Sequence, residues 1–198
     1  MLVASSACSD ATAPSSLTAP RGATAYEGTQ SGYEGTQSGQ NDDGWRGQTS
    51  FQVTIDPHAR NELHFGSYTL SLPANSVCRF ADSGYGIDAF DDSCAVESGP
   101  ITIRAKLSVD TDGRQRIDLQ PRMRFTPNKS VVLSKYVGQA ALLSADSWRI
   151  LFCPAAADLQ GCVDESLLDE SLTTRIDFER GLIYRRIKHF SGYLAAES

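Results

Sequence analysis

Three histidines, His58, His64 and His189, are the side chains best suited to act as general bases near neutral pH. A hydrolytic triad also needs a nucleophile and an orienting acid, and the sequence contains no Gly-x-Ser-x-Gly elbow. A His-Glu-x-x-His zinc-protease motif is absent as well. His189 and Ser191 share one face of an expected strand, but the pair lacks an evident acid. We therefore expect a protein that is not an enzyme and that uses no cofactor.

Five cysteines carry the remaining covalent chemistry: Cys8, Cys78, Cys94, Cys153 and Cys162. They form no Cys-x-x-Cys pair or Cys/His cluster, so their spacing argues against a zinc site. If Cys8 is modified, four cysteines remain, an even number that favours two disulfides in an exported protein. Of the three possible pairings we predict the local one, Cys78–Cys94 and Cys153–Cys162, because each pair flanks a polar or irregular loop.

The short apolar run at residues 2–8 ends in small residues and Cys8. It resembles the lipobox of bacterial lipoproteins, in which the signal peptide is cut before a cysteine that is acylated. The resemblance implies that residues 1–7 are the end of a signal peptide and that Cys8 anchors the chain to a membrane. It places the protein in the bacterial cell envelope, on the periplasmic face of the outer or inner membrane or at the cell surface. The alternative is a soluble protein with one unpaired thiol.

The loop between Cys78 and Cys94 carries three acids that could bind a cation: Asp88, Asp91 and Asp92. Oxygen ligands at irregular spacing can suit calcium, although a solvated acidic loop explains the same residues. The aromatic side chains that could build a sugar-binding platform are Tyr85, Phe90 and Trp148. They could equally be buried in the core.

Basic residues are dense only near the C-terminus, at Arg180, Arg185, Arg186 and Lys188. Arg185 and Arg186 point to opposite faces of a strand and do not form one patch. Arg180, Arg185 and Lys188 are candidates for contact with anionic lipid headgroups or an acidic partner. The alternative is a polar outer face that protects an edge strand.

Composition excludes several classes of function. The 198 residues carry a net charge of −6, so no basic field is available to displace counterions from nucleic acid. No run approaches the roughly 20 apolar residues of a transmembrane helix. Membrane attachment would therefore need a lipid or a partner protein.

Residues 8–47 have the composition of a low-complexity linker, rich in Ala, Ser, Thr, Gly and Gln. A seven-residue segment at 26–32 is repeated without change at 33–39, and two such copies are too few and too short for a solenoid. We expect a disordered N-terminal tether that precedes one folded domain at residues 48–198.

That domain alternates apolar and polar residues over many short stretches separated by turn signals, which is typical of β-strands. The pattern predicts an all-β fold, an antiparallel β-sandwich of the Ig-like or Greek-key type. One or two helical turns are expected at 164–172. The expected strands are 51–55, 63–65, 68–72, 101–109, 115–119, 123–125, 131–133, 149–152, 174–178, 182–187 and 191–195.

Three short motifs, at residues 70–76, 99–103 and 189–193, are similar to the β-sandwich domain shared by ankyrins, netrin receptors and zonula-occludens proteins. Asn75-Ser76 stands where that family has Gly-Ala. The resemblance covers roughly residues 51–195 and implies protein–protein contact or mechanical linkage without catalytic residues. We therefore expect a non-catalytic envelope lipoprotein whose sandwich binds another envelope or membrane protein, for example as an accessory subunit of a membrane complex. The alternative is a glycan- or calcium-binding module that uses the Cys78–Cys94 loop.

Overall fold

The computed structural model describes residues 45–81, 84–110, 112–145, 147–154 and 161–197. Cys8, residues 8–44 of the expected linker and its duplicated segment lie outside these residues. The first strand begins at Trp45, before the domain boundary expected at residue 48. No helix among the described residues has the length and apolar character needed to cross a membrane.

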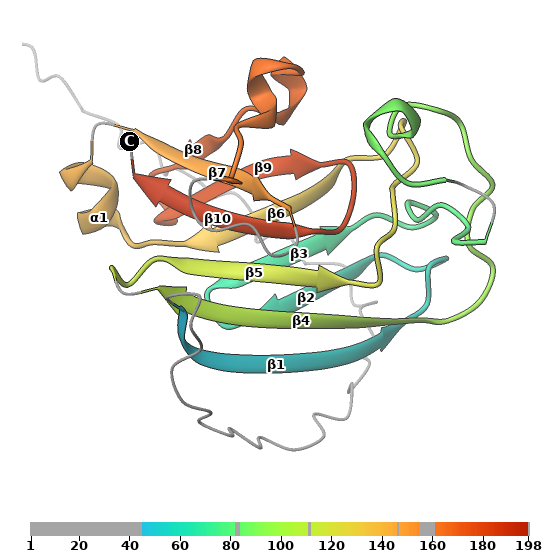
Figure 1. The fold of residues 1–198 in the computed structure, drawn as a ribbon, viewed down its shortest axis with the longest axis horizontal. Coiled ribbons are helices and arrows are strands. Elements are labelled where there is room, and N and C mark those ends of the chain that lie inside the picture. Colours follow the sequence, from blue (N-terminus) through green and yellow to red (C-terminus); the bar gives the residue numbers. More distant parts are fainter. Residues whose placement is uncertain (1–44, 82–83, 111, 146, 155–160, 198) are drawn as a thin grey trace, which may run out of the picture.

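Two five-stranded antiparallel sheets form the fold, as the sequence pattern predicts (Figure 1). In spatial order the first contains β1 (Trp45–Ile55), β4 (Ile101–Asp110), β5 (Gln115–Gln120), β10 (Gly192–Glu197) and β7 (Trp148–Cys153). The second contains β2 (Asn61–Phe65), β3 (Tyr68–Leu72), β6 (Val131–Tyr136), β9 (Leu182–Ile187) and β8 (Arg175–Asp177). Because the chain crosses repeatedly between the sheets, strands far apart in sequence become neighbours.

Alternation along each strand builds the core. In β4 the side chains of Ile103 and Ala105 are buried, whereas Arg104 and Lys106, which alternate with them, are exposed. β3 buries Tyr68, Leu70 and Leu72 in the same way. Successive side chains of a strand point to opposite faces, so the apolar face of each sheet lines one shared interior.

The three hairpins expected from turn signals are all present: β2–β3, β4–β5 and β8–β9. Gly66 in the first turn has a φ of +60°, a left-handed conformation that glycine adopts without steric cost. Asn75 also adopts a left-handed φ of 57°, which asparagine tolerates better than most residues. Asn75 can therefore form the turn that follows β3.

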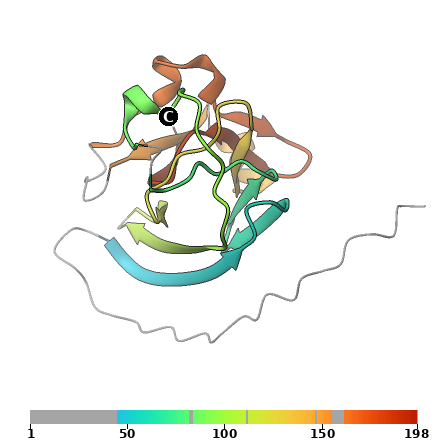
Figure 2. The ribbon, with the colours of Figure 1, turned by 90° about the vertical axis from the view of Figure 1, so that its right-hand side faces the viewer.

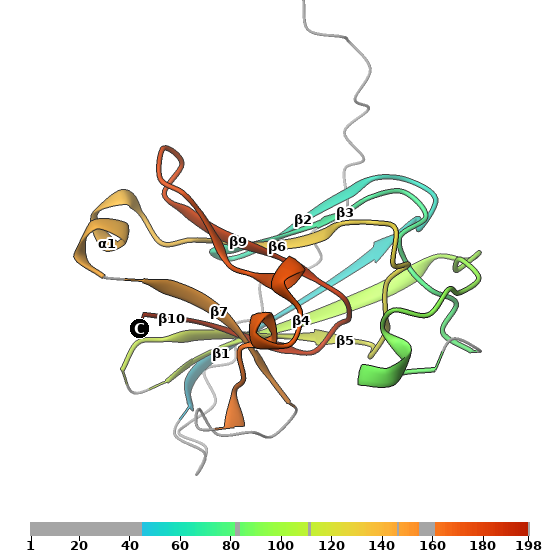
Figure 3. The same cartoon turned by 90° about the horizontal axis from the view of Figure 1, so that it is seen from above.

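Three regions differ from the expected elements. Residues 123–125 form only isolated bridges, from Phe125 to Val77 and from Arg124 to His189, instead of a strand. The unexpected helix α1 (Gln139–Ser144) lies at the opposite end of the sandwich from the loop that carries the 3₁₀-helix η1 (Ile87–Ala89) (Figure 3). The helical turns expected at 164–172 are two 3₁₀-helices, η3 (Glu165–Leu167) and η4 (Glu170–Leu172).

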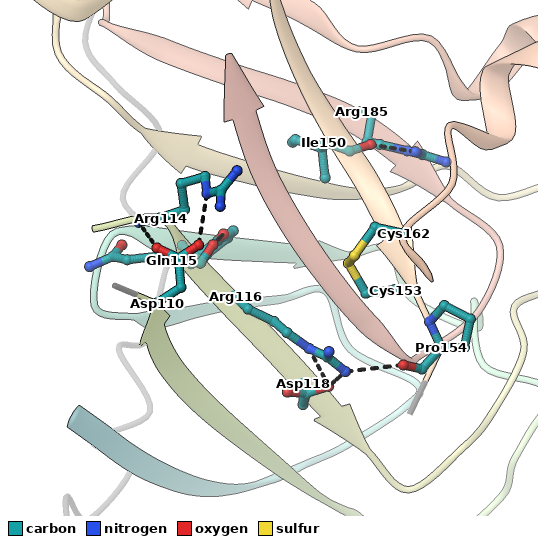
Figure 4. The surroundings of a disulfide bond; sticks show 11 residues. Asp110, Arg114, Gln115, Arg116, Asp118, Ile150, Cys153, Pro154, Cys162 and Arg185 are labelled. Atoms are coloured by element: carbon teal, nitrogen blue, oxygen red, sulfur yellow. Dashed lines mark hydrogen bonds and ion pairs between the residues drawn. A yellow bond between two sulfur atoms is a disulfide. The ribbon is translucent and has the colours of Figure 1, made fainter. Parts of the chain in front are cut away.

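Both predicted disulfides, Cys78–Cys94 and Cys153–Cys162, are present. The second, shown in Figure 4, lies beside β10, where it packs against Leu194. Beside it Arg116 donates to Asp118 and to the carbonyl of Pro154. A Cβ atom at Gly192 would lie 2.6 Å from Nη2 of Arg116, so only glycine lets this guanidinium lie across the strand.

We predict that removing either disulfide lowers the free energy of unfolding without changing the fold. The Cys78→Ala/Cys94→Ala variant, with a sequence separation of 16 residues, should lose about 3 kcal/mol of loop-closure entropy. The Cys153→Ala/Cys162→Ala variant, with a separation of 9, should lose slightly less, about 2.6 kcal/mol. Urea denaturation measures both losses. Peptide mapping under non-reducing conditions that linked Cys78 to Cys153 would contradict the pairing.

Candidate functional site

Several candidate residues of the sequence come together where the chain leaves β9 and turns into β10. Lys188 and His189 make side-chain contacts here with two segments, both of which project above the sandwich when it is seen along its long axis (Figure 2). One is the Cys78–Cys94 loop, which carries η1. The other, called here the double-turn segment, is residues 164–172 with η3 and η4.

His189 is fully buried and holds both segments. Its Nε2 lies 3.0 Å from Oε1 of Glu165 in η3, and its Nδ1 lies 3.2 Å from the hydroxyl of Tyr85 in the Cys78–Cys94 loop. That hydroxyl donates in turn to the carbonyl of Phe190 at 2.6 Å, and burial raises the pKa of Tyr85. The ring of Phe90 stacks on the imidazole at a centroid distance of 4.1 Å. The imidazole is thus enclosed on its face and engaged at both nitrogens.

Glu165 also neutralises a buried cation, Arg185. The two side chains form an ion pair with 2.7 Å between Nη2 and Oε2, and the Arg185 side chain is 0% exposed. Its Nη1 donates to the carbonyl of Ile150 in β7 at 2.6 Å (Figure 4). Because Arg185 belongs to the second sheet and Ile150 to the first, this guanidinium spans the sandwich and fixes η3 to both sheets. Its burial corrects the expectation that Arg185 offers a surface contact.

Lys188 joins the two segments directly. Its Nζ lies 2.6 Å from Oδ1 of Asp91 in the Cys78–Cys94 loop and 2.6 Å from Oδ2 of Asp169 in the double-turn segment. Burial alone would lower the pKa of Lys188, but the hydrogen bonds from both carboxylates outweigh it and raise that pKa. The hydrogen bond from Lys188, with help from the backbone N–H of Ser171, lowers the pKa of Asp169 to about 2. Lys188 is therefore committed to internal ion pairs, whereas Arg180 remains 78% exposed beside Asp177.

The double-turn segment contains a repeat that explains its shape. Asp-Glu-Ser-Leu occurs at 164–167 and again at 169–172. In each copy the aspartate caps its 3₁₀-helix, accepting from the N–H of Ser166 or Ser171, as an Asp side chain before a turn commonly does. The capping pattern was readable in the sequence. The partners of Glu165 and Asp169 were not, because they come from β9 and the residues after it.

The acids of the Cys78–Cys94 loop do not assemble a cation site. Asp88 and Asp92 are exposed, and the carboxylate of Asp91 is paired with Lys188. Among the described parts of the chain no three His, Cys, Asp or Glu side chains come together as a group that could hold a metal ion. The calcium hypothesis for these three aspartates is therefore left without a supporting geometry.

The aromatic residues proposed as a sugar platform are separated. Tyr85 and Phe90 meet edge to face, with 5.4 Å between ring centroids, and both pack towards His189. Trp148 begins β7 near α1 and donates to the carbonyl of Ala141, so it lies at the other end of the sandwich. These three rings cannot stack on one ligand.

A cleft of about 510 Å³ opens between the Cys78–Cys94 loop and the turn at 126–129. Its lining residues include Asn75, Asp91 and Lys129, so the cleft presents an amide, a negative charge and a positive charge. A second cleft, of about 290 Å³, lies on the other side of the disulfide near Val77 and Phe80. His189 lines neither cleft.

His189 does have an acid partner, Glu165, which the sequence did not reveal, but its hydroxyl partner is Tyr85 and not Ser191. A general base must reach the proton that it abstracts. The enclosed ring of His189 could reach a substrate only if the segment carrying Tyr85 and Phe90 moved away. We interpret the arrangement as a clasp, formed by Lys188, His189, Glu165 and Arg185, that holds the two segments against the sandwich.

The sequence matches no protein-family model, no curated protein and no solved structure. The similarity to the sandwich domain of ankyrins and netrin receptors therefore stays a prediction, and function has to be argued from the geometry.

We predict that Glu165→Gln strongly destabilises the protein. The substitution leaves the buried Arg185 guanidinium without its counter-charge, and breaking a buried ion pair from one side costs about 3 kcal/mol or more. The matched control is Glu170→Gln, the equivalent position of the second repeat, which is exposed and should change the free energy of unfolding by less than about 0.5 kcal/mol. Urea denaturation compares them, and equal small effects would contradict a stabilising role for the ion pair.

We predict a second effect that depends on pH. The lowered pKa of Asp169 means that its stabilisation is present above the unfolded-state pKa of about 4 and is lost as the pH falls towards about 2. Asp169→Asn should therefore cost about 1 kcal/mol near neutral pH, an amount reduced by solvent screening, and the difference from wild type should shrink between about pH 5 and about pH 2. Asp92→Asn is the exposed control. A difference that stayed constant over this range would contradict the assignment.

Proposed function

We propose that the chain is a non-catalytic lipoprotein of the bacterial cell envelope, whose β-sandwich serves as a protein-interaction or structural module. One observation carries the proposal: the two disulfides pair every cysteine of the folded domain and leave Cys8 as the only one outside them. Disulfides form and persist in oxidising compartments outside the cytosol. An unpaired cysteine that ends a short apolar run is then best explained as an acylation site.

In this proposal Cys8 holds the chain at a membrane through its lipid, and residues 8–44 are the linker to the domain. A flexible chain of this length has a mean span of about 35 Å, enough to hold the sandwich clear of the lipid surface. The partner would be another envelope or membrane protein, and the chain could serve as an accessory subunit of a membrane complex.

The clasp supports an interaction role more than a catalytic one. It immobilises two loops against the sandwich through two ion pairs to Lys188 and the buried network around Arg185. Loops held in one conformation lose little entropy when they bind a partner. Recognition loops on a rigid β-scaffold are a common solution for binding.

We predict that the protein isolated from the membranes of its native host begins at a diacylated or triacylated Cys8. Intact-mass measurement with mapping of the N-terminal peptide tests this. A Cys8→Ala variant should lack the lipid mass and leave the membrane fraction, while its domain retains the melting temperature of the wild type. An unmodified chain that begins at Met1 would overturn the anchor, and Cys8 would then be an ordinary thiol.

A further inference from the structure

Three of the four edge strands of the sandwich are protected against pairing with another chain. Proteins commonly protect edges with short strands, charged side chains or a covering segment. β8 has only three residues and carries a charge at each end, at Arg175 and Asp177. β2 has five residues and includes Glu62. The edge of β7 is covered, because Phe152 exchanges two backbone hydrogen bonds with Val163.

β1 is the exception. It is the outermost strand of the first sheet (Figure 1) and has 11 residues. The stretch 47–55 contains no charged residue and no proline, and its register with β4 is unbroken from Gln48 to Ile55. Within the part of the chain that the structure describes, β4 is the only strand paired with β1. The other edge of β1 therefore presents a row of backbone groups that can pair with a further strand.

Apolar side chains beside this edge are only half-buried. Phe51 and Val53 on the inner face of β1, and Leu63 on β2, pack against the core but stay partly exposed. The ring of Phe51 meets the ring of Phe65 in β2 edge to face, with 5.7 Å between centroids, so the two edge strands border the same open side of the sandwich. A strand added to β1 would cover Phe51 and Val53 and remove apolar surface from water.

We infer that β1 pairs with β1 of a second copy of this chain, antiparallel about a two-fold axis at Phe51, the midpoint of the stretch 47–55. The two five-stranded sheets then form one continuous sheet. A two-fold contact brings the same surface of both copies together, and like charges directly opposite each other on paired strands are destabilising. The uncharged stretch of β1 avoids this repulsion, although the chain carries a net charge of −6.

The charges at the two ends of the stretch also favour a second copy. Arg46 precedes the stretch and Asp56 follows it. Antiparallel pairing about Phe51 brings the end that carries Arg46 in one copy to the end that carries Asp56 in the other, and symmetry repeats this at the opposite end. Such complementarity fixes register and partner. An unrelated strand would not need an edge that is neutral along its length and complementary to itself at its ends.

Sedimentation velocity of the full chain tests the inference. The chain should carry Cys8→Ala, so that neither a lipid nor a free thiol joins two copies, and we expect a dimer. Thr49 is exposed on the inner face of β1 and lies opposite Val53 of the second copy in this register. Thr49→Lys would bury an unpaired ammonium group in the contact and should raise the dissociation constant about tenfold or more. The matched control is His64→Lys on β2, a side chain that is 68% exposed, and it should leave the dimer intact.

Cysteine crosslinking tests the register. Ser50 and Gln52 are exposed on the outer face and lie opposite each other across the two-fold axis. Directly opposed residues of antiparallel strands have Cα atoms about 4.5 or 5.5 Å apart, within the range of a disulfide. Ser50→Cys/Gln52→Cys should therefore oxidise to a covalent dimer. Either substitution alone should not, because identical positions are then diagonal neighbours, about 7–8 Å apart.

Glu62→Cys/His64→Cys on β2 is the control for crosslinking by random collision and should stay monomeric under denaturing, non-reducing conditions. The circular dichroism spectrum of Thr49→Lys should match that of its parent, which shows that loss of the dimer is not unfolding. A monomer throughout the micromolar range would overturn the inference, whether the edge is covered by other residues of the same chain or left for another protein. A dimer unaffected by Thr49→Lys, or equal crosslinking at β1 and β2, would overturn it too. Because the tested chain carries no lipid, the result is independent of the proposed anchor.

Discussion

The ion pair between Glu165 and Arg185 is the constraint from which the candidate site follows. A guanidinium that is fully buried must be both neutralised and hydrogen-bonded, since an unpaired charge in the interior is very costly. Arg185 meets this requirement with the carboxylate of Glu165 and the carbonyl of Ile150. Once Glu165 is drawn to this position, its second oxygen reaches His189, and the double-turn segment lies against the sandwich.

Two kinds of crosslink then hold this site: disulfides within single loops, and polar contacts between loops. The disulfides close loops of short sequence separation, Cys78 with Cys94 and Cys153 with Cys162, and each limits the conformations of its own loop. They do not connect the loops to each other. That connection is polar, through Lys188 and through the hydrogen bonds of His189 to Tyr85 and Glu165. Reagents that reduce disulfides and changes of pH would therefore act on different parts of the same site.

The sequence predicts the strands, the hairpins and the disulfides because each depends on local pattern: a period of two, turn residues, and cysteines that flank loops. It fails at α1, whose six residues contain too little periodicity to identify a helix. Arg185 is the instructive error. Strand alternation places it on the same face as Ile183 and Ile187, which are buried, so the pattern itself indicated an inward arginine. What no local pattern supplies is the identity of the carboxylate that neutralises it, because Glu165 comes from a segment twenty residues earlier.

The tandem Asp-Glu-Ser-Leu copies separate what local sequence determines from what tertiary contact determines. Both copies make the same capped turn, because an aspartate before a serine N–H is sufficient for that. Which side chain is then buried depends on what the sandwich presents to each copy. The first copy faces Arg185, which needs a carboxylate, and Glu165 takes the interior position. The second copy faces the apolar core, and Leu172 takes the interior position. Leu167 of the first copy, and Leu168 after it, thus remain in solvent where Glu165 takes the interior position. The ion pair that anchors this segment therefore also determines which side chain of the first copy is buried.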